Sequence, residues 1–395
     1  MPRIADVLER ESEAVDLEPG DFERLIGRRE RKERNRRIRA GAVGIIVVLA
    51  MAVAFFRSLT SAGVPADRVE PKPAPAGTLA YELGGDIYVA DADGTNAVDI
   101  TEALHGKCPG RFWSPSWSPD GRYLAFRDST GCGPGGVVIT DPQGNVVANV
   151  PAPGGQFSWS PDSTRFAVWD ENSYNEAGVG TFTIGIYGID GTRETQIALP
   201  PGSDSGGGRL VWTPDGTSLI VNHLEVPVDG GTPRDIPFTE AFRSRSGAIW
   251  DAALAYSSDG SQVAYGTRHA LMVARSDWSE PREVLGEAAH TATWSPTGGL
   301  IAVTADAPGD PWAPNELRVV DVATGSATLL FEGEPGTWLN VIGFSPDGDR
   351  ILFSEERPVS GQPGNYLYSL WSVGVDGSNA SQIVVGTLFG VWRPT

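Results

Sequence analysis

The stretch SWSPDGRYLAF, residues 116–126, decides the fold, because versions of it recur along the chain. They read FWSPSWSPDGRYLAF (112–126), QFSWSPDSTRFAVW (156–169), RLVWTPDGTSLIV (209–221), ALAYSSDGSQVAYG (253–266), TATWSPTGGLIAV (291–303) and VIGFSPDGDRILFS (341–354). In each copy, alternating residues predict a strand, Ser-Pro-Asp-Gly or a variant predicts a turn, and a second apolar run predicts an antiparallel return. The Ser and Asp recur without a private partner, so we expect Ser118 and Asp120 to form the turn rather than a catalytic site.

Each copy places one large residue directly before its turn. These anchors are Trp117, Trp159, Trp212, Tyr256, Trp294 and Phe344, and the terminal LFGVWRPT (388–395) adds Trp392. Successive anchors lie 42, 53, 44, 38, 50 and 48 residues apart. Such spacings are typical of the four-stranded blade of a β-propeller. We expect each anchor to fill the gap between neighbouring blades.

The number of blades follows from the two ends of the repeat region. Residues 79–101 supply three strands without a leading one, whereas residues 388–395 supply a leading strand with nothing after it. Joining them closes the ring and removes the open sheet edges. The sequence therefore predicts an all-β, seven-bladed propeller, with six blades as the alternative.

The recurring Trp-Ser-Pro-Asp-Gly, followed by a short apolar strand, resembles the TolB-like propeller repeats, bacterial relatives of the WD-repeat propellers. The resemblance covers residues 79–395 and implies the fold. The chain differs from TolB itself, whose N-terminal domain and cleaved secretion signal are replaced here by a basic segment and an apolar stretch. We therefore transfer no role in an outer-membrane complex.

The apolar stretch AGAVGIIVVLAMAVAFF (40–56) has no charged residue and predicts a single transmembrane helix over residues 40–57. The preceding RRERKERNRRIR (28–39) has eight basic residues, so the positive-inside rule places the N-terminus in the cytoplasm and the propeller outside the cell membrane. A cleaved signal peptide, cut near residues 60–62, is the alternative. The predicted parts are a cytoplasmic head (1–39), the anchor (40–57), a Pro-rich stalk (58–78) and the propeller (79–395).

Charge and cysteine positions restrict the partners and the chemistry. Residues 40–395 carry 20 Lys and Arg against 40 Asp and Glu, an excess of acid that repels phosphate backbones and excludes nucleic acid. Cys108 and Cys132 are symmetric about the turn at Asp120. We expect them to form a disulfide in an oxidising compartment rather than a two-cysteine metal site.

Catalysis and cofactors find no support in the sequence. No Gly-x-Ser-x-Gly nucleophile elbow is present. The four histidines have unequal offsets of −12, +11, +13 and −4 from their anchors, and we expect them not to converge as metal ligands. They are His105, His223, His269 and His290. The candidates for a binding rim are Trp113, Trp169, Trp250, Trp278, Trp312 and Trp338, although packing is the commoner role of tryptophan in this fold.

Three functions follow, in order of preference. The first is a non-enzymatic, membrane-anchored propeller that binds or scaffolds a protein, a peptide or an envelope glycan. The second is a transmembrane regulator, similar to membrane proteins that accompany sigma factors, in which two short amphipathic helices within residues 1–27 hold a cytoplasmic protein. The third is a lyase or hydrolase that acts on an envelope polymer.

Overall fold

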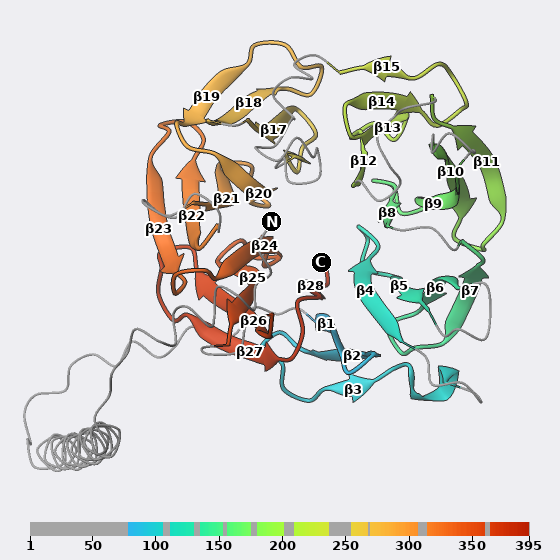
Figure 1. Ribbon diagram of the computed structural model, residues 1–395, viewed down its shortest axis with the longest axis horizontal. Helices are drawn as coiled ribbons and strands as arrows, with labels where there is room; N and C mark the ends of the chain where they lie inside the picture. The colour runs from blue at the N-terminus through green and yellow to red at the C-terminus, as the bar shows by residue number, and fades with distance from the viewer. Residues whose placement is uncertain are drawn as a thin grey trace, which may run out of the picture. The chain divides into compact units, whose positions relative to one another are not determined.

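The computed structural model describes the chain over residues 78–105, 111–129, 135–152, 156–174, 180–200, 209–236, 254–267, 269–306, 314–359 and 364–394. Seven four-stranded antiparallel sheets are arranged as blades around a central axis (Figure 1). The seven-bladed, all-β prediction is therefore confirmed. The alternative of six blades is wrong.

Blades 1 to 4 contain the following strands, given from the axis outward. Blade 1 has β28 (Gly390–Trp392), β1 (Thr78–Leu83), β2 (Asp86–Asp91) and β3 (Val98–Asp99). Blade 2 has β4 (Phe112–Trp117), β5 (Leu124–Asp128), β6 (Gly136–Thr140) and β7 (Val146–Val150). Blade 3 has β8 (Phe157–Trp159), β9 (Arg165–Tyr174), β10 (Gly180–Gly188) and β11 (Arg193–Ala198). Blade 4 has β12 (Leu210–Trp212), β13 (Ser218–Val221), β14 (Leu224–Pro227) and β15 (Arg234–Asp235).

The remaining three blades follow the same order. Blade 5 has β16 (Leu254–Tyr256), β17 (Gln262–Gly266), β18 (Leu271–Arg275) and β19 (Arg282–Leu285). Blade 6 has β20 (Ala289–Trp294), β21 (Leu300–Ala305), β22 (Glu316–Asp321) and β23 (Ala327–Glu332). Blade 7 has β24 (Trp338–Phe344), β25 (Arg350–Pro358), β26 (Tyr366–Gly374) and β27 (Ser381–Val385). A short 3-10 helix, η1 (Glu102–Leu104), follows β3.

The two ends of the repeat region meet in blade 1, as predicted. β28 pairs antiparallel with β1, in the register Leu79↔Trp392 and Tyr81↔Gly390. Beyond the strands, the backbone N–H of Arg393 donates to the carbonyl oxygen of Thr78 at 2.7 Å. The C-terminal strand therefore supplies the innermost strand of a blade whose other three strands come first in the propeller.

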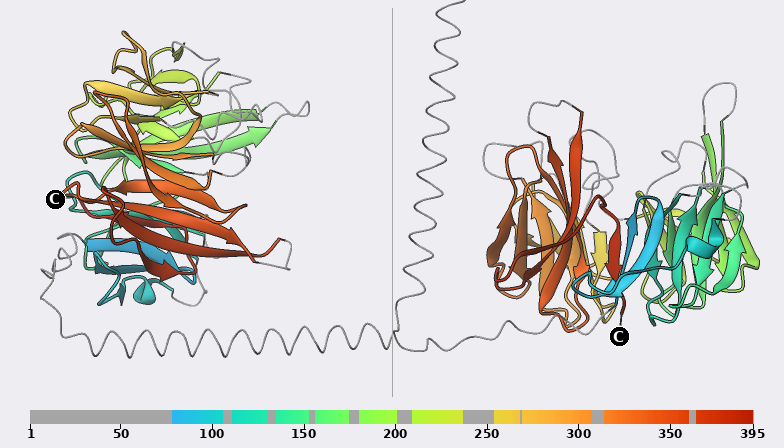
Figure 2. Two further views of the ribbon diagram at one scale, coloured as in Figure 1. Left: turned by 90° about the vertical axis from the view of Figure 1, so that its left-hand side faces the viewer. Right: turned by 90° about the horizontal axis from the view of Figure 1, so that it is seen from below.

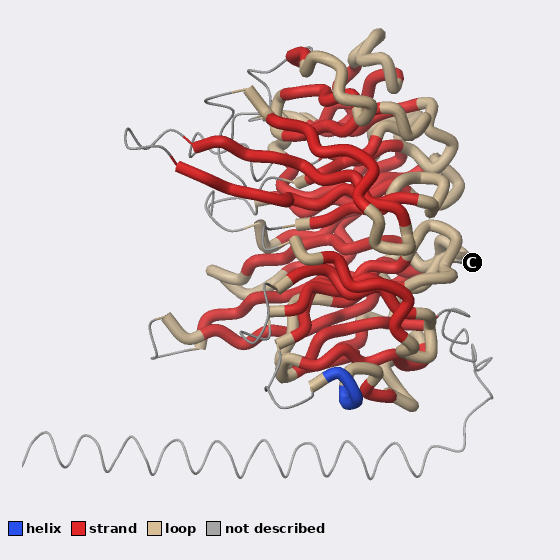
Figure 3. Tube along the Cα trace, turned by 90° about the vertical axis from the view of Figure 1, so that its right-hand side faces the viewer, coloured by secondary structure: helices blue, strands red, loops and turns tan. Residues whose placement is uncertain are grey.

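The propeller has two unlike faces. On one, which we call the turn face, each innermost strand turns into the second strand, and the third turns into the fourth. On the other, the loop face, the second strand connects to the third and one blade connects to the next. Figure 2 shows the long β25–β26 hairpin rising on the side opposite the C-terminus, and Figure 3 shows the same separation from another side. β1 begins and β28 ends on the turn face.

Among the described residues, the core consists of seven hydrophobic clusters, one between each pair of adjacent blades. Each cluster contains the anchor of one blade packed on the blade before it. For example, Trp212 of blade 4 lies among Ile184 and Leu199 of blade 3. Burial of apolar surface at every interface holds the ring together, since blades contact only their neighbours.

No helix among the described residues is long and apolar enough to span a membrane. The predicted head, the anchor over 40–57 and nearly all of the stalk lie outside the described residues. β1 begins at Thr78, which is the last residue assigned to the stalk.

Candidate functional site

The recurring Ser and Asp form the same local network in successive turns. The Ser118 hydroxyl donates to Asp120 Oδ1 at 2.6 Å and accepts the backbone N–H of Tyr123 at 3.0 Å. Asp120 Oδ1 also accepts the N–H of Arg122 at 3.0 Å. Equivalent hydroxyl-to-carboxylate bonds join Ser160 to Asp162, Thr213 to Asp215, Ser257 to Asp259 and Ser345 to Asp347. Each carboxylate is occupied by its own turn, so these pairs are scaffold.

The turn in blade 5 gives a pH-dependent prediction. The Ser257 hydroxyl, and then the N–H and hydroxyl of Ser261, lower the pKa of Asp259 from 3.8 to about 2. Because this pKa is depressed in the folded state, its contribution to stability is complete above pH 3.8 and is lost as the pH falls through about 2. We expect Ser257→Ala to raise the Asp259 pKa towards 3.8 in a carboxyl NMR titration.

A matched variant checks that this effect is local. Ser160→Ala removes the corresponding hydroxyl from blade 3, where Ser160 is the largest cause of the lowered pKa of Asp162. It should raise the pKa of Asp162 and leave that of Asp259 unchanged. An Asp259 pKa that does not respond to Ser257→Ala would show that the hydroxyl bond is not the cause.

The seven anchors all end the innermost strand of their blades. Five are nearly inaccessible (Trp117, Trp159, Trp212, Trp294 and Trp392), and two are partly buried (Tyr256 and Phe344). The indole N–H of Trp159 donates to the carbonyl oxygen of Ser116 at 3.1 Å, and that of Trp212 donates to Ser158 at 3.0 Å. Both acceptors directly precede the anchor of the previous blade. The tryptophans thus join adjacent blades by a hydrogen bond as well as by packing.

Blade 1 departs from this pattern. The indole N–H of Trp392 donates to Ala92 of its own blade at 3.2 Å, and within the described part of the chain the indole N–H of Trp117 has no hydrogen-bond partner. The guanidinium of Arg393 lies 5.3 Å from the Trp117 ring centroid and donates to the carbonyl oxygen of Gly121 at 2.7 Å. A cation–π contact therefore lies at the position where the anchors Trp159, Trp212 and Trp294 donate an indole hydrogen bond to the preceding blade.

The predicted disulfide cannot be placed, because Cys108 and Cys132 lie outside the described residues. The candidate rim tryptophans divide into three groups. Trp169 and Trp278 are buried in the core, Trp113 is half-buried and Trp338 is 41% exposed. Trp250 and Trp312 lie outside the described residues.

All four histidines lie towards the loop face. His223 and His269, at offsets of +11 and +13 from their anchors, lie in the connections between the second and third strands of their blades. His105 and His290, at offsets of −12 and −4, lie just before an innermost strand or near its start. Both kinds of position are at the same end of a blade, so unequal offsets do not separate the histidines as the sequence argument assumed. Three of them pair with aspartates: His105 with Asp86 at 2.5 Å, His223 with Asp235 at 3.6 Å and His290 with Asp306 at 2.8 Å.

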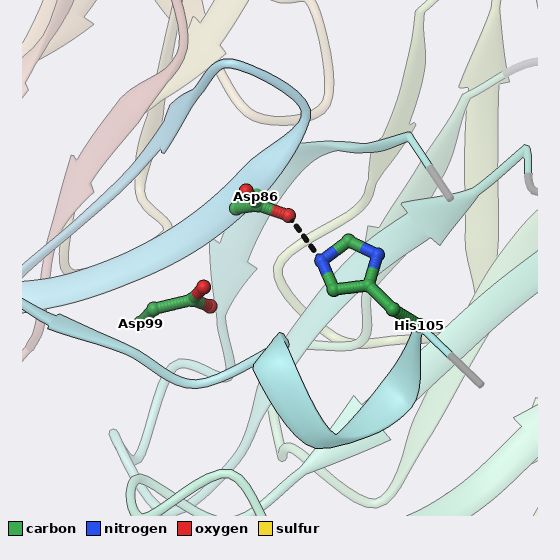
Figure 4. A group of neighbouring side chains, drawn as sticks. All are labelled: Asp86, Asp99 and His105. Carbon is green, nitrogen blue, oxygen red and sulfur yellow. Dashed lines mark ion pairs between the residues drawn. The ribbon is translucent and has the colours of Figure 1, made fainter. Parts of the chain in front are cut away.

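One of these pairs has a third potential ligand. Asp86, Asp99 and His105 each offer one ligand atom, and these atoms all lie within 4.8 Å of one another (Figure 4). Asp86 begins β2, Asp99 ends β3, and His105 follows η1. Residues from three consecutive elements of blade 1 therefore meet, although 19 positions separate the first from the last. The sequence reasoning missed this group because it compared histidines only with each other.

A second feature of the loop face is a set of exposed aromatic side chains on blade 7. In the strand register, Trp338 is paired with Glu356, Glu356 with Tyr368, and Pro358 with Tyr366. Paired residues share a side of the sheet, and so do alternate residues of one strand. Trp338, Tyr366 and Tyr368 therefore lie on one side of the β24–β26 sheet.

Blade 1 is too short to cover this side. Leu352, on the same side as Glu356, packs on blade 1, so the aromatic side faces that blade. β1 ends at Leu83 and β2 begins at Asp86, whereas β25 extends to Pro358. Trp338 and Tyr366 are each 41% exposed as a result. A longer blade 1 would have buried them.

Two more aromatic residues lie on the other flank of blade 1. Phe389, which directly precedes β28, is 41% exposed, and its ring centroid is 6.1 Å from that of Trp113 in β4. We refer to Trp113, Trp338, Tyr366, Tyr368 and Phe389 together as the aromatic patch. Among the other large exposed apolar residues, Leu367 lies on β26 between Tyr366 and Tyr368, whereas Val98, Val146 and Leu329 lie on the outermost strands of their blades.

No protein-family model and no curated protein matches the sequence. Among solved structures, the chain is similar to a protein assigned as TolB from Agrobacterium tumefaciens (16% identity, 81% of this chain and 98% of that one, TM-score 0.41). It is also similar to the β-propeller domain of the Trilobed protease from Pyrococcus furiosus (13%, 78% and 93%, 0.46). A third is the β-propeller domain of Cps50 (Swd1) from Myceliophteria thermophila (13%, 69% and 85%, 0.43). At these identities and TM-scores, the similarities carry no argument about function.

Proposed function

We propose that this chain is a membrane-anchored, extracytoplasmic propeller that binds a protein partner through the loop face and catalyses no reaction. The observation that carries the proposal is the aromatic patch. Tyrosine and tryptophan are enriched at protein interfaces because they bury a large area while keeping a polar group for hydrogen bonding. A group of partly exposed aromatic residues at one end of a propeller is therefore a suitable contact surface.

The charges around the patch indicate what kind of partner fits. Glu356 lies between Trp338 and Tyr368 in the strand register, and the body of the protein carries twice as many acidic as basic residues. A partner with basic and apolar residues complements such a surface. We propose a protein for this reason, and an envelope glycan is an outcome that the experiment below distinguishes.

The membrane location rests on the amino-acid sequence. Residues 40–57 are long and apolar enough for one span, and the eight basic residues before them place the N-terminus in the cytoplasm. With that topology the propeller and its loop face lie outside the cell membrane. The basic run (28–39) of the head then fixes the orientation, and a cytoplasmic protein bound at residues 1–27 would make the chain a regulator.

A double substitution in the aromatic patch tests the binding surface. We expect Trp338→Ala with Tyr366→Ala to reduce the amount of cross-linked partner recovered from membranes by about tenfold or more, because interface aromatics often contribute at least 2 kcal/mol each. The variant should remain folded, since both side chains are partly exposed at 41% and lie outside the closed core. The measurement is cross-linking of the tagged full-length chain, followed by mass spectrometry.

The matched control lies at the turn face. Val146 and Val147, both 43% exposed at the start of β7, are replaced together by alanine, and this variant should retain the partner. Equal recovery from the two double variants would remove the patch from the interface. Polysaccharide in place of protein in the captured material would replace the protein partner by a glycan, and loss of a cytoplasmic protein on deleting residues 2–27 would favour the regulator.

A further inference from the structure

We propose that Asp86, Asp99 and His105 form a zinc-binding site in blade 1, independent of the binding surface described above. Two carboxylates and one imidazole are a ligand set that suits Zn²⁺, which takes nitrogen and oxygen donors at about 2.0–2.2 Å. Ligand atoms within 4.8 Å of one another leave room for an ion between them after small side-chain movements. In Figure 4 the Asp86 carboxylate and the imidazole point towards each other, with Asp99 beside them.

The surroundings hold the Asp99 side chain in place. Asp99 Oδ1 accepts the N–H of Thr101 at 2.7 Å, its hydroxyl at 2.8 Å and the N–H of Glu102 at 3.1 Å. This leaves Oδ2 as the oxygen for a cation. Thr101 is fully buried, and its hydroxyl oxygen also accepts the N–H of Ile87 at 3.1 Å, which ties Asp99 to the strand that carries Asp86. Such outer contacts orient metal ligands.

The third ligand is positioned by an aromatic neighbour. The imidazole of His105 packs on the ring of Phe112, with centroids 5.5 Å apart, and its Nε2 points to Asp86 Oδ1 at 2.5 Å. Neighbouring ligand atoms lie roughly 3.3 Å apart around a tetrahedral zinc ion, so the pair must open by roughly 0.8 Å to admit one. His105 and Asp86 are 30% and 26% exposed, which gives an ion access from solvent.

The local charge favours a cation. Asp86 and Asp99 supply two carboxylates beside one imidazole. A divalent ion would compensate this negative charge, and it would join the start of β2, the end of β3 and the residue after η1 in the blade that closes the ring.

The test is a titration of the purified full-length protein, carrying a tag without histidine, with Zn²⁺ in an isothermal calorimeter. We expect one ion per chain in the wild type. His105→Gln and Asp86→Asn should each raise the dissociation constant about tenfold or more, because each removes a ligand. The control is His290→Gln, which breaks a His–Asp pair with no third ligand among the described residues, and it should bind as the wild type does.

Two further measurements keep the outcome decisive. In the wild type, the NMR signals of the His105 ring nitrogens should shift on addition of zinc while those of His223, His269 and His290 do not, a readout that survives if a variant fails to fold. The titration is repeated with both Cys108 and Cys132 changed to serine. Unchanged affinity in His105→Gln, equal shifts of all four histidines, or binding that disappears with the cysteines would each overturn the proposal.

Discussion

Removal of residues 387–395 is expected to abolish the folded propeller. The deletion takes away β28, leaves the inner edge of β1 unpaired at Leu79 to Tyr81, and removes Trp392, which is 6% exposed in the cluster between blades 7 and 1. Loss of a strand and a buried tryptophan costs more than about 5 kcal/mol, comparable with the whole stability of many domains. Size-exclusion chromatography and near-ultraviolet circular dichroism should show aggregated or unfolded chains.

A variant with the C-terminal strand moved to the N-terminal side of the propeller tests whether the deletion unfolds the protein because β28 is missing. In this variant residues 387–394 are placed directly before Thr78 through a short glycine-containing linker and are absent from the C-terminus. The linker need span little distance, because the N–H of Arg393 already donates to Thr78 at 2.7 Å. Folding should return. A deletion variant that remains folded would mean that blade 1 needs no fourth strand.

Replacement of Trp169 by alanine is expected to cost about 3–5 kcal/mol of the free energy of unfolding. Its side chain is fully buried in the cluster between blades 3 and 4 and meets the ring of Phe182 edge to face, with centroids 6.3 Å apart. The midpoint of urea unfolding, with the slope of the transition unchanged, measures the loss.

The control is the same substitution at Trp338, which is 41% exposed. It should lower the free energy of unfolding clearly less than Trp169→Ala does, because the Trp338 side chain is partly in water and its removal leaves no closed cavity. Similar shifts at the two positions would contradict the division of the tryptophans into core and patch. The pair also separates stability from binding, since Trp338 belongs to the patch that we propose binds the partner.

The fold was predictable because one piece of local chemistry repeats. Each turn needs a hydroxyl such as Ser118, usually with a carboxylate such as Asp120, and each blade needs one large residue against its neighbour. Both requirements appear in the sequence as the same short motif, repeated at intervals of 38 to 53 residues. The pairing of β28 with β1 was equally visible, since a strand without a blade and a blade without a strand can satisfy each other.

The candidate sites were not predictable to the same degree. Trp169 and Trp338 are the same residue type, and their exposure depends on how far the adjacent blade extends, which no local pattern records. Asp86, Asp99 and His105 meet because a hairpin and one turn of 3-10 helix fold back on each other. Alignment of the blades reveals the residues that recur in all of them, whereas the residues of these sites do not recur from blade to blade.

The joining of both ends in blade 1 also determines when the protein can finish folding. β1 is synthesised about 300 residues before its inner partner β28, which at roughly 5–20 residues per second is a wait of about 15–60 s. During that time the inner edge of β1 is available to any other unpaired strand, including that of a second nascent chain. The ring cannot close before residues 387–394 are synthesised. A chain that ends just before them therefore contains nearly the whole sequence but cannot form the closed propeller.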